Sequence, residues 1–238
     1  MIIEWEKDDA VAMITLNNRE NRHNPAFARA ILDVFAEIEK DESIYAVVIT
    51  SSDEKSWSQG IDLPWIMNVL ANREFQTIKD FLYSLNAIFK KILLFPMPVI
   101  ASINGHAAGN GAILASCCDF RLMKADREYF FLPGVDINIP YLPGIQEIIK
   151  QAFPYCKLEE AVLTGKLYDA KELEEHHVII KACDDAEAVL RESIAFAKTF
   201  KKKRSLFGEI KKRLNKHIIA VIDNEDPAYI EELNIFKQ

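Results

Sequence analysis

Residues 98–117 read PVIASINGHAAGNGAILASC. The run Val99–Ile103 is continuously apolar, which is typical of a strand buried on both faces of a parallel sheet. The small-residue turn Asn104–Gly111 follows, and it leads directly into the apolar run Ala112–Cys117. A strand, a glycine-rich turn and a helix in this order predict a turn at the carboxyl end of a sheet strand. Ligands bind at that edge in α/β proteins.

The same alternation extends on both sides of this stretch. Residue patterns predict a hairpin from strands at 2–5 and 10–16, helices at 25–40 and 74–95, and buried strands at 46–50 and 119–123. Alternating strands and helices indicate right-handed β-α-β crossovers and a largely parallel sheet. From Pro143 onward the pattern is helical almost throughout. We therefore expect an α/β core over residues 1–185 and a helical region over residues 186–238.

Composition narrows the class of protein. The chain has 238 residues, half of them hydrophobic, and a net charge of −7, which argues against nucleic acid as the main partner. No apolar run approaches the roughly 20 residues that span a bilayer, and the first residues do not resemble a secretory signal. Adjacent Cys117 and Cys118 cannot form an ordinary disulfide. These features predict a cytoplasmic protein with no membrane span.

A second small-residue loop has the same position relative to a predicted strand as the first. Residues 56–63 read SWSQGIDL and follow the predicted strand at 46–50, just as residues 104–111 follow the strand Val99–Ile103. Two such loops side by side can direct two backbone N–H groups at one oxygen atom, which would form an oxyanion hole. Either loop alone is also compatible with an ordinary strand-to-helix turn, because short glycine motifs are weak evidence.

The two loops together resemble those of a known family. Residues 57–63, WSQGIDL, are similar to the motif F-x-x-G-x-D-[LI]; residues 98–111 are similar to P-x-I-A-x-[IV]-x-G-x-A-x-G-G-G; residues 163–165, LTG, give a looser match. These motifs resemble those of the crotonase superfamily, the enoyl-CoA hydratases and isomerases. Residues 96–138 look most like plant-type Δ3,Δ2-enoyl-CoA isomerases.

The resemblance implies a fold and a ligand. It implies a crotonase (ClpP-like) fold of β-β-α units, with a helical C-terminal region that serves trimerisation and covers the ligand. The expected partner is an acyl-CoA thioester, with coenzyme A present as part of the substrate and no tightly bound cofactor. The expected assembly is a homotrimer or a dimer of trimers.

The resemblance also implies site residues. It assigns the two N–H groups that grip the thioester oxygen to Gln59 and Asn110, where the family usually has smaller residues. The motifs further suggest a substrate-binding set made of Ser58, Gly60, Asp62, Ala108, Gly109, Ile113, Gly134 and Tyr141.

Two expected carboxylates are missing. Hydration of an enoyl thioester needs two positioned acid/base groups. The positions that hold the two glutamates in hydratases are Ile113 and Gly134 here. Asp136 is the nearest remaining carboxylate and becomes the candidate base, although it also suits a loop-capping role. Tyr141 could donate a hydrogen bond or could simply pack with other aromatic residues.

Other polar groups have structural interpretations. We expect His23 to help begin the first helix and His106 to pack. Residues 176–177 are adjacent histidines, which point about 100° apart on a helix, so no metal site is predicted. The basic clusters at 201–204 and 211–213 suit solvated helix faces, or alternatively the phosphates of coenzyme A.

Several functions remain open from the sequence. An enoyl-CoA isomerase is favoured over a hydratase, because one base suffices for an isomerase. The alternatives are an acyl-CoA hydrolase or decarboxylase, and a non-catalytic protein that binds acyl-CoA or a protein partner.

The late helical region supports assembly into oligomers, because it has more apolar residues than a small tail can bury: Ile194, Phe196, Phe200, Leu206, Phe207, Ile210, Leu214, Ile218 and Ile219.

Overall fold

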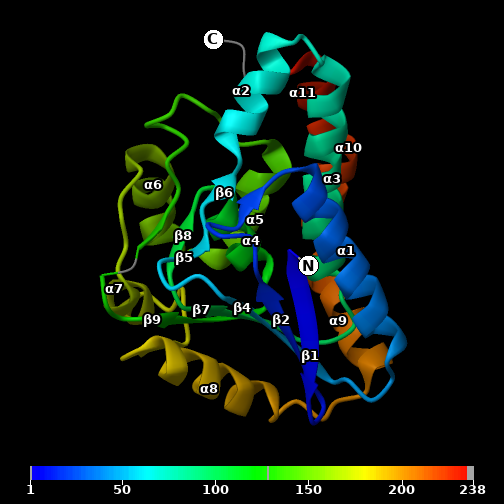
Figure 1. The fold of residues 1–238 in the computed structure, drawn as a ribbon, viewed down its shortest axis with the longest axis vertical. Coiled ribbons are helices and arrows are strands. Elements are labelled where there is room, and N and C mark those ends of the chain that lie inside the picture. The colour runs from blue at the N-terminus through cyan, green and yellow to red at the C-terminus, as the bar shows by residue number, and fades with distance from the viewer. Residues whose placement is uncertain (1, 128, 235–238) are drawn as a thin grey trace.

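The computed structural model describes residues 2–127 and 129–234. A six-stranded sheet with the order β1-β2-β4-β7-β9-β11 lies at its centre (Figure 1). Strands β1 and β2 are antiparallel, and all the other neighbours are parallel. The strands are Ile3–Asp8, Val11–Leu16, Ala46–Ser51, Val99–Ile103, Phe120–Lys124 and Lys181–Cys183. The predicted largely parallel sheet is therefore confirmed.

Helices cover both faces of this sheet. Helix α8 (Ala186–Ala197) covers one face, as Figure 1 shows, and helix α1 (Pro25–Lys40) lies on the other side. Strand β4 shows the consequence for side chains. Its residues Val47 and Ile49 belong to the large core, whereas Val48 belongs to a smaller core under α8. The continuous apolar run at 46–50 thus reflects burial on both faces.

The helices begin where local chemistry places them. Asn24 caps α1, because its side-chain oxygen accepts a hydrogen bond from the Phe27 N–H. Helix α3 (Phe75–Leu93) matches the predicted helix at 74–95. Helix α2 (Leu63–Ala71) was not predicted, although Asp62 caps it in the same way as Asn24 caps α1.

The chain after residue 142 is mostly helical, as predicted, with α5 to α7 before β11 and α8 to α11 after it. The predicted boundary at residue 185 falls on the N-cap of α8. Ile218, Ile222 and Ile230 from the later helices are buried in the same large core as β2 and β7. Helices α5, α6, α7, α9, α10 and α11 span Pro143–Ala152, Tyr155–Thr164, Ala170–Glu175, Arg204–Leu214, Lys216–Asn224 and Asp226–Glu232.

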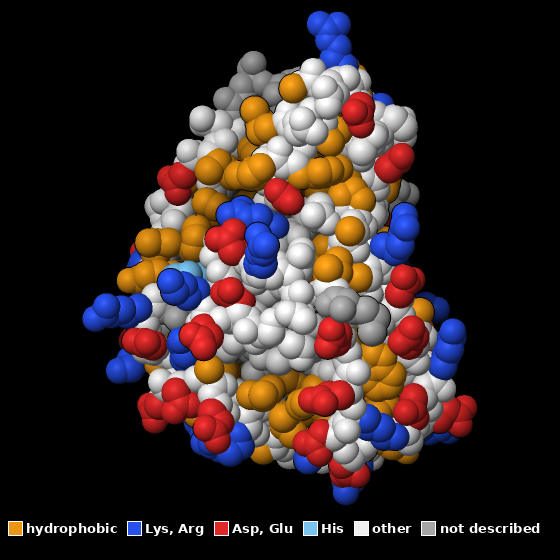
Figure 2. Space-filling view, viewed as in Figure 1, with side chains coloured by type: hydrophobic (Ala, Val, Ile, Leu, Met, Phe, Trp, Pro, Cys, Tyr) orange, Lys and Arg blue, Asp and Glu red, His pale blue; other side chains and the backbone are white. Residues whose placement is uncertain are grey.

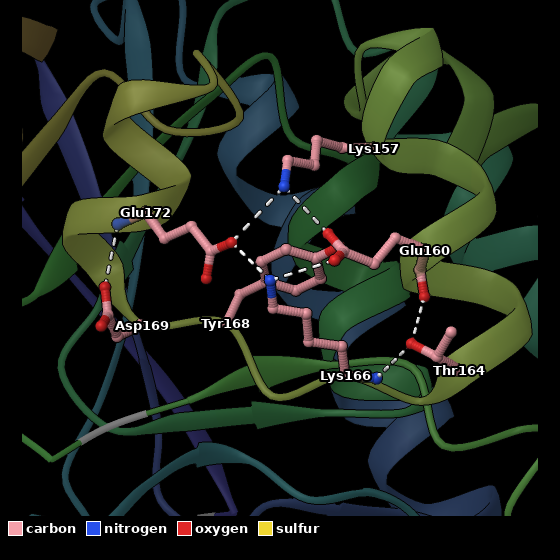
Figure 3. A network of polar contacts seen from close by, with 7 residues as sticks. All are labelled: Lys157, Glu160, Thr164, Lys166, Tyr168, Asp169 and Glu172. Atoms are coloured by element: carbon pink, nitrogen blue, oxygen red, sulfur yellow. Dashed lines mark hydrogen bonds and ion pairs between the residues drawn. The ribbon is translucent and has the colours of Figure 1, made fainter.

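A closed ionic network joins α6 to α7 (Figure 3). Lys166 lies 3.2 Å from Glu160 and 2.6 Å from Glu172, and Lys157 lies 3.0 Å from Glu160. The Tyr168 hydroxyl donates to Glu160 at 2.9 Å. The Lys157 hydrogen bond, followed by those of Tyr168 and Lys166, lowers the pKa of Glu160 to about 2. Two cations and two anions satisfy one another here, so the group is structural.

Two cations of the basic clusters bind the protein itself. Lys211 is buried, and its Nζ donates to the Ile92 carbonyl at 2.9 Å and to Asp119 Oδ2 at 2.7 Å. Arg204 donates to two main-chain carbonyls at the C-terminal end of α1. The interpretation of these residues as solvated or phosphate-binding is therefore wrong for Lys211 and Arg204.

No helix among residues 2–127 and 129–234 has the length and apolar character needed to cross a bilayer.

Replacing Lys211 by Met should lower the free energy of unfolding by about 3–5 kcal/mol, because Asp119 would remain buried without its cation. Chemical denaturation of both proteins measures the difference. Lys212→Met is the matched control, since Lys212 is exposed and should change stability by no more than about 0.5 kcal/mol. Equal, small losses in the two variants would show that the Lys211–Asp119 pair does not hold α9 to the sheet.

Candidate functional site

A small second sheet brings the two predicted loops together. Strands β5 (Ser56–Ser58), β8 (His106–Ala108) and β10 (Phe130–Phe131) form it in the order β10-β8-β5, with parallel neighbours. Helix α4 (Asn110–Cys117) begins directly after β8. The two loops that follow the buried strands β4 and β7 therefore lie side by side at one edge of the sheet.

The backbones of these loops touch at two glycines. Gly60 has φ +73°, and a Cβ atom there would lie 2.7 Å from Asn110 N and 2.6 Å from the Ala108 carbonyl oxygen. A Cβ atom at Gly111 would lie 2.3 Å from the Ser58 carbonyl oxygen. No larger residue fits at either position unless the loops move apart.

The backbone N–H of Gln59 is already in use. It donates to the Glu20 carbonyl at 3.0 Å, and the Gln59 side chain donates to Ser56 Oγ at 3.0 Å. In this structure the predicted donor at Gln59 is therefore not free to grip a ligand oxygen. If this loop donates a hydrogen bond to a ligand oxygen, the donor is a neighbouring residue.

Ile61 presents its N–H in a different direction. Strand β6 (Gly60–Ile61) pairs in parallel with β3 (Arg22–His23), and the Asp62 N–H donates to the His23 carbonyl at 2.9 Å. Successive N–H groups of a strand point to opposite sides. The Ile61 N–H therefore points away from β3, and the Ile61 residue lines the cavity described below.

Asn110 is the first residue of α4, so its N–H has no partner within the helix. Its side chain is turned into the protein, where Nδ2 lies 2.8 Å from His23 Nδ1. This contact accounts for an asparagine at a position where the resemblance leads us to expect glycine. The amide group is bonded to His23, while the backbone N–H remains next to Gly60.

His23 connects both loops. Its Nε2 lies 2.9 Å from Ser58 Oγ, which donates to the Asn21 carbonyl at 2.8 Å. Because an amide nitrogen only donates, Nδ1 accepts from Asn110 and Nε2 carries the proton. Burial lowers the pKa of His23 to about 3, so the ring is neutral. The sequence predicted only that His23 helps to begin α1, whereas in the structure it also links the two loops. Ser58 belongs to the same hydrogen-bond network.

A cavity of about 330 Å³ lies beside these groups. It is mostly apolar, and residues of α2, α3, α4 and α5, of the two loops and of the segment before α5 line it. Seven predicted residues line it: Gln59, Ala108, Gly109, Asn110, Ile113, Gly134 and Tyr141. Its other lining residues are Arg22, Ile61, Leu63, Leu82, Leu85, Asn86, Phe89, Phe131, Pro133, Ile137, Ile139, Pro140, Leu142 and Ile145. Ser58, Gly60 and Asp62, which were predicted to bind substrate, do not line it.

The candidate base Asp136 lies outside this cavity. Its side chain is exposed and lies against Gly165, where an added Cβ would be 2.0 Å from Asp136 Oδ2. None of the described residues that line the cavity is Asp, Glu or His. The loop-anchoring alternative for Asp136 therefore agrees better with this geometry than the catalytic one.

Tyr141 occupies the space beside Gly134. The Gly134 N–H donates to Tyr141 Oη at 2.9 Å, and a Cβ at Gly134 would lie 2.7 Å from Tyr141 Cζ. A glutamate at Gly134 would therefore require Tyr141 to move. Burial raises the pKa of Tyr141 to about 12, so its hydroxyl is neutral and can donate a hydrogen bond at neutral pH.

Helix α3 contributes a cavity wall that the sequence did not identify. Leu82, Leu85, Asn86 and Phe89 recur at helical spacing, which reads as an ordinary core stripe. The available signal was Asn86, a polar residue inside that stripe. Figure 2 shows hydrophobic side chains gathered on this face, in the part of the view where Figure 1 places α2, β6 and α5.

Comparison with known proteins gives a consistent result. The family model of enoyl-CoA hydratase/isomerase matches residues 6–232. The chain is 25% identical to enoyl-CoA delta isomerase 3 of Arabidopsis thaliana, over 92% of this chain and 94% of that protein. It is 32% identical to a short-chain-enoyl-CoA hydratase of Clostridium acetobutylicum, over 60% of this chain and 54% of that protein.

Solved structures agree on the fold. Human mitochondrial delta3-delta2-enoyl-CoA isomerase matches with a TM-score of 0.91 at 18% identity, covering 100% of this chain and 93% of that one. A probable enoyl-CoA hydratase from Mycobacterium tuberculosis matches with a TM-score of 0.88 at 22% identity, covering 99% and 97%. At these identities the likeness concerns the fold, and it confirms the predicted crotonase fold with a helical C-terminal region.

The His23 network should make folding stability sensitive to acid. The pKa of His23 is about 3 in the folded state against an ordinary value of 6.5, so the unfolded chain takes up the proton first as pH falls. Stability from this group is complete above about pH 6.5 and declines below it, by about 2 kcal/mol at pH 5. Urea denaturation at pH 7 and pH 5 measures the decline.

His23→Gln is the matched variant, because the glutamine carboxamide can both donate and accept hydrogen bonds but does not titrate. Its unfolding free energy should fall less between pH 7 and pH 5 than that of the parent. An identical pH dependence in the two proteins would mean that His23 is not held neutral by burial.

Proposed function

Because the chain belongs to the enoyl-CoA hydratase/isomerase family, we propose that its cavity binds an acyl-CoA thioester and supports isomerisation of a 3-enoyl-CoA to a 2-enoyl-CoA. The observation that carries the proposal is the contact between the two loops at Gly60, which brings the backbones of Ile61 and Asn110 together beside an apolar cavity.

In this proposal the thioester oxygen accepts hydrogen bonds from two backbone N–H groups. Asn110 supplies one, from the start of α4, as the sequence suggested. Ile61 supplies the other in place of Gln59, whose N–H is bonded to Glu20. Two fixed donors stabilise the enolate oxygen that forms when C2 loses a proton, and they do so in a cavity with apolar walls.

The acid/base chemistry favours isomerisation over hydration. Hydration needs two positioned groups, one for water and one for the carbon proton, and the described lining residues include no carboxylate. Isomerisation needs one group that removes a proton from C2 and returns one to C4 while the double bond moves from C3–C4 to C2–C3. Tyr141 is the titratable group available for this shuttle.

Tyr141 would act as the base in its phenolate form. The N–H of Gly134 points at Tyr141 Oη and favours that form, whereas burial raises the pKa to about 12. Little phenolate exists at neutral pH, so turnover is slow there and rises with pH.

The lack of a carboxylate among the described lining residues also favours a second candidate function, in which the protein binds acyl-CoA without turnover.

We retain the trimer, or dimer of trimers, as part of the proposal. Helix α9 supports it, because Leu206, Ile210 and Leu214 are spaced four residues apart and are 59%, 54% and 68% exposed. An apolar row of this kind suits a contact between subunits.

Replacing Asn110 by Pro should weaken acyl-CoA binding about three- to tenfold relative to Asn110→Ala, because only the proline variant lacks the N–H. Proline is acceptable at the first position of a helix, and both variants lose the contact with His23. Titration calorimetry with hexanoyl-CoA measures the difference. Free coenzyme A has no carbonyl and should bind the two variants alike. Equal affinities for hexanoyl-CoA would exclude Asn110 as a donor.

Activity on 3-hexenoyl-CoA should rise about tenfold per pH unit between pH 7 and pH 10, since the phenolate fraction of Tyr141 rises in that proportion below its pKa of about 12. Absorbance of the conjugated product follows the reaction. Tyr141→Phe should abolish the activity and leave hexanoyl-CoA binding intact, and hydration of 2-hexenoyl-CoA should be very slow. Tight binding without conjugation at any pH would instead identify a non-catalytic acyl-CoA protein, and release of free thiol would identify a hydrolase.

A further inference from the structure

A chain of hydrogen bonds inside the protein runs from one loop to the other. The Ser58 hydroxyl donates to the Asn21 carbonyl at 2.8 Å, and its oxygen accepts from the Gly60 N–H at 3.1 Å. The same oxygen lies 2.9 Å from His23 Nε2, and Nδ1 of that ring lies 2.8 Å from Asn110 Nδ2. The chain therefore begins at the Gly60 backbone and ends at the Asn110 side chain.

Each proton of this chain has a fixed place. The Asn21 carbonyl only accepts, so the Ser58 hydroxyl gives its proton there and keeps two lone pairs for N–H donors. His23 Nε2 therefore carries a proton, and Nδ1 accepts one from the Asn110 amide. A charged ring would carry a second proton on Nδ1, opposite the amide nitrogen, and that contact would be lost. Only the neutral ring makes both contacts, and burial keeps it neutral by lowering the pKa of His23 to about 3.

The ring is also fixed in place by packing. His23, Ser58 and Asn110 are all buried. The His23 ring stacks on Phe27, with 4.2 Å between the ring centroids and an angle of 20° between the ring planes. Phe27 belongs to α1 and is buried in the large core, and no residue of α1 lines the cavity. The ring thus holds both loops against a helix that lies outside the ligand space.

The two ends of the hydrogen-bond chain adjoin the two N–H groups that the proposed function assigns to the thioester oxygen. Gly60 immediately precedes Ile61, and Asn110 carries the second N–H on its own backbone. Two donors stabilise one oxygen only when both point at the same place. We propose that His23 is a positioning residue, which keeps the N–H groups of Ile61 and Asn110 aligned without contacting the ligand.

The inference rests on the proposed binding of acyl-CoA and adds the residue that aligns its two donors. His23 is not among the residues that line the cavity, so its effect on a ligand has to pass through the two loops. Alignment matters only for a ligand with a carbonyl oxygen to grip. The affinity for an acyl-CoA should therefore depend on His23, whereas the affinity for free coenzyme A should not.

His23→Leu tests this, because leucine has no hydrogen-bonding group. Titration calorimetry should show hexanoyl-CoA binding about three- to tenfold more weakly than to the parent, and free coenzyme A binding alike. Isotope-edited infrared spectroscopy of hexanoyl-CoA labelled with ¹³C at the carbonyl gives a second readout. Aligned N–H donors lower the stretching frequency of the bound carbonyl, so the frequency should be higher in the variant than in the parent.

Asn215→Ala is the matched control. Asn215 is also a buried polar residue, its Nδ2 donates to the Leu93 carbonyl at 2.7 Å, and it does not line the cavity. This variant loses a buried hydrogen bond and becomes less stable, but its carbonyl frequency and its affinity for hexanoyl-CoA should equal those of the parent.

Asn110→Ala completes a double-mutant cycle, because it keeps the backbone N–H and removes the amide that contacts His23. Alone it should weaken hexanoyl-CoA binding and raise the carbonyl frequency. In the His23→Leu background the amide has no ring to contact, so the double variant should bind within about twofold of His23→Leu. If His23→Leu fails to fold, the carbonyl frequency in Asn110→Ala decides the matter, since that variant breaks the same contact.

The outcomes separate the two proposals. A carbonyl frequency unchanged in the variants, equal losses of affinity for hexanoyl-CoA and free coenzyme A, or losses that multiply in the double variant would overturn the role of His23 and leave acyl-CoA binding in place. A parent protein that binds no acyl-CoA would overturn the proposed function and, with it, the alignment of the donors.

Discussion

The direct contact between two backbone loops is the constraint on which the site depends. Gly60 and Gly111 allow the loop after β4 and the loop after β7 to approach until main-chain atoms touch. Side chains would hold these loops apart, and Ile61 and Asn110 would then present their N–H groups to separate regions. The small sheet β10-β8-β5 holds the loops at this distance, and the buried group of His23, Ser58 and Asn110 links them through polar contacts.

The polar groups of the cavity divide into those directed inward and those withdrawn from it. Asn110 has its amide bonded to His23, so a bulky residue at this position does not have to occupy the ligand space. Tyr141 keeps a neutral hydroxyl in an apolar wall, where a carboxylate would be costly to bury. In the proposed function, backbone donors and the Tyr141 phenol meet an uncharged acyl group between mostly apolar walls.

Much of the fold could be predicted from the sequence, because its signals are local or periodic. The apolar runs at 46–50 and Val99–Ile103 are strands buried on both faces, and the helix predicted at 25–40 is α1 with the same bounds. The site was harder to predict, because its hydrogen-bond partners come from distant segments of the chain. The bond from Gln59 to Glu20 and the bond from Asn86 to Asp226 leave no periodic pattern. Resemblance found the loops, but it could not show which N–H is free or that Asp136 lies against Gly165.

The contact between Asn86 and Asp226 spans 140 residues, which bears on the order in which the protein is made. During synthesis α3 and both loops leave the ribosome long before α11. The large core can begin to assemble from the first strands and helices, but the wall behind Asn86 is complete only when Asp226 has emerged. Five of the six sheet strands are therefore synthesised before residue 125, whereas the wall behind Asn86 is completed only near residue 226, so a ligand that needs this wall binds after most of the sheet has been made.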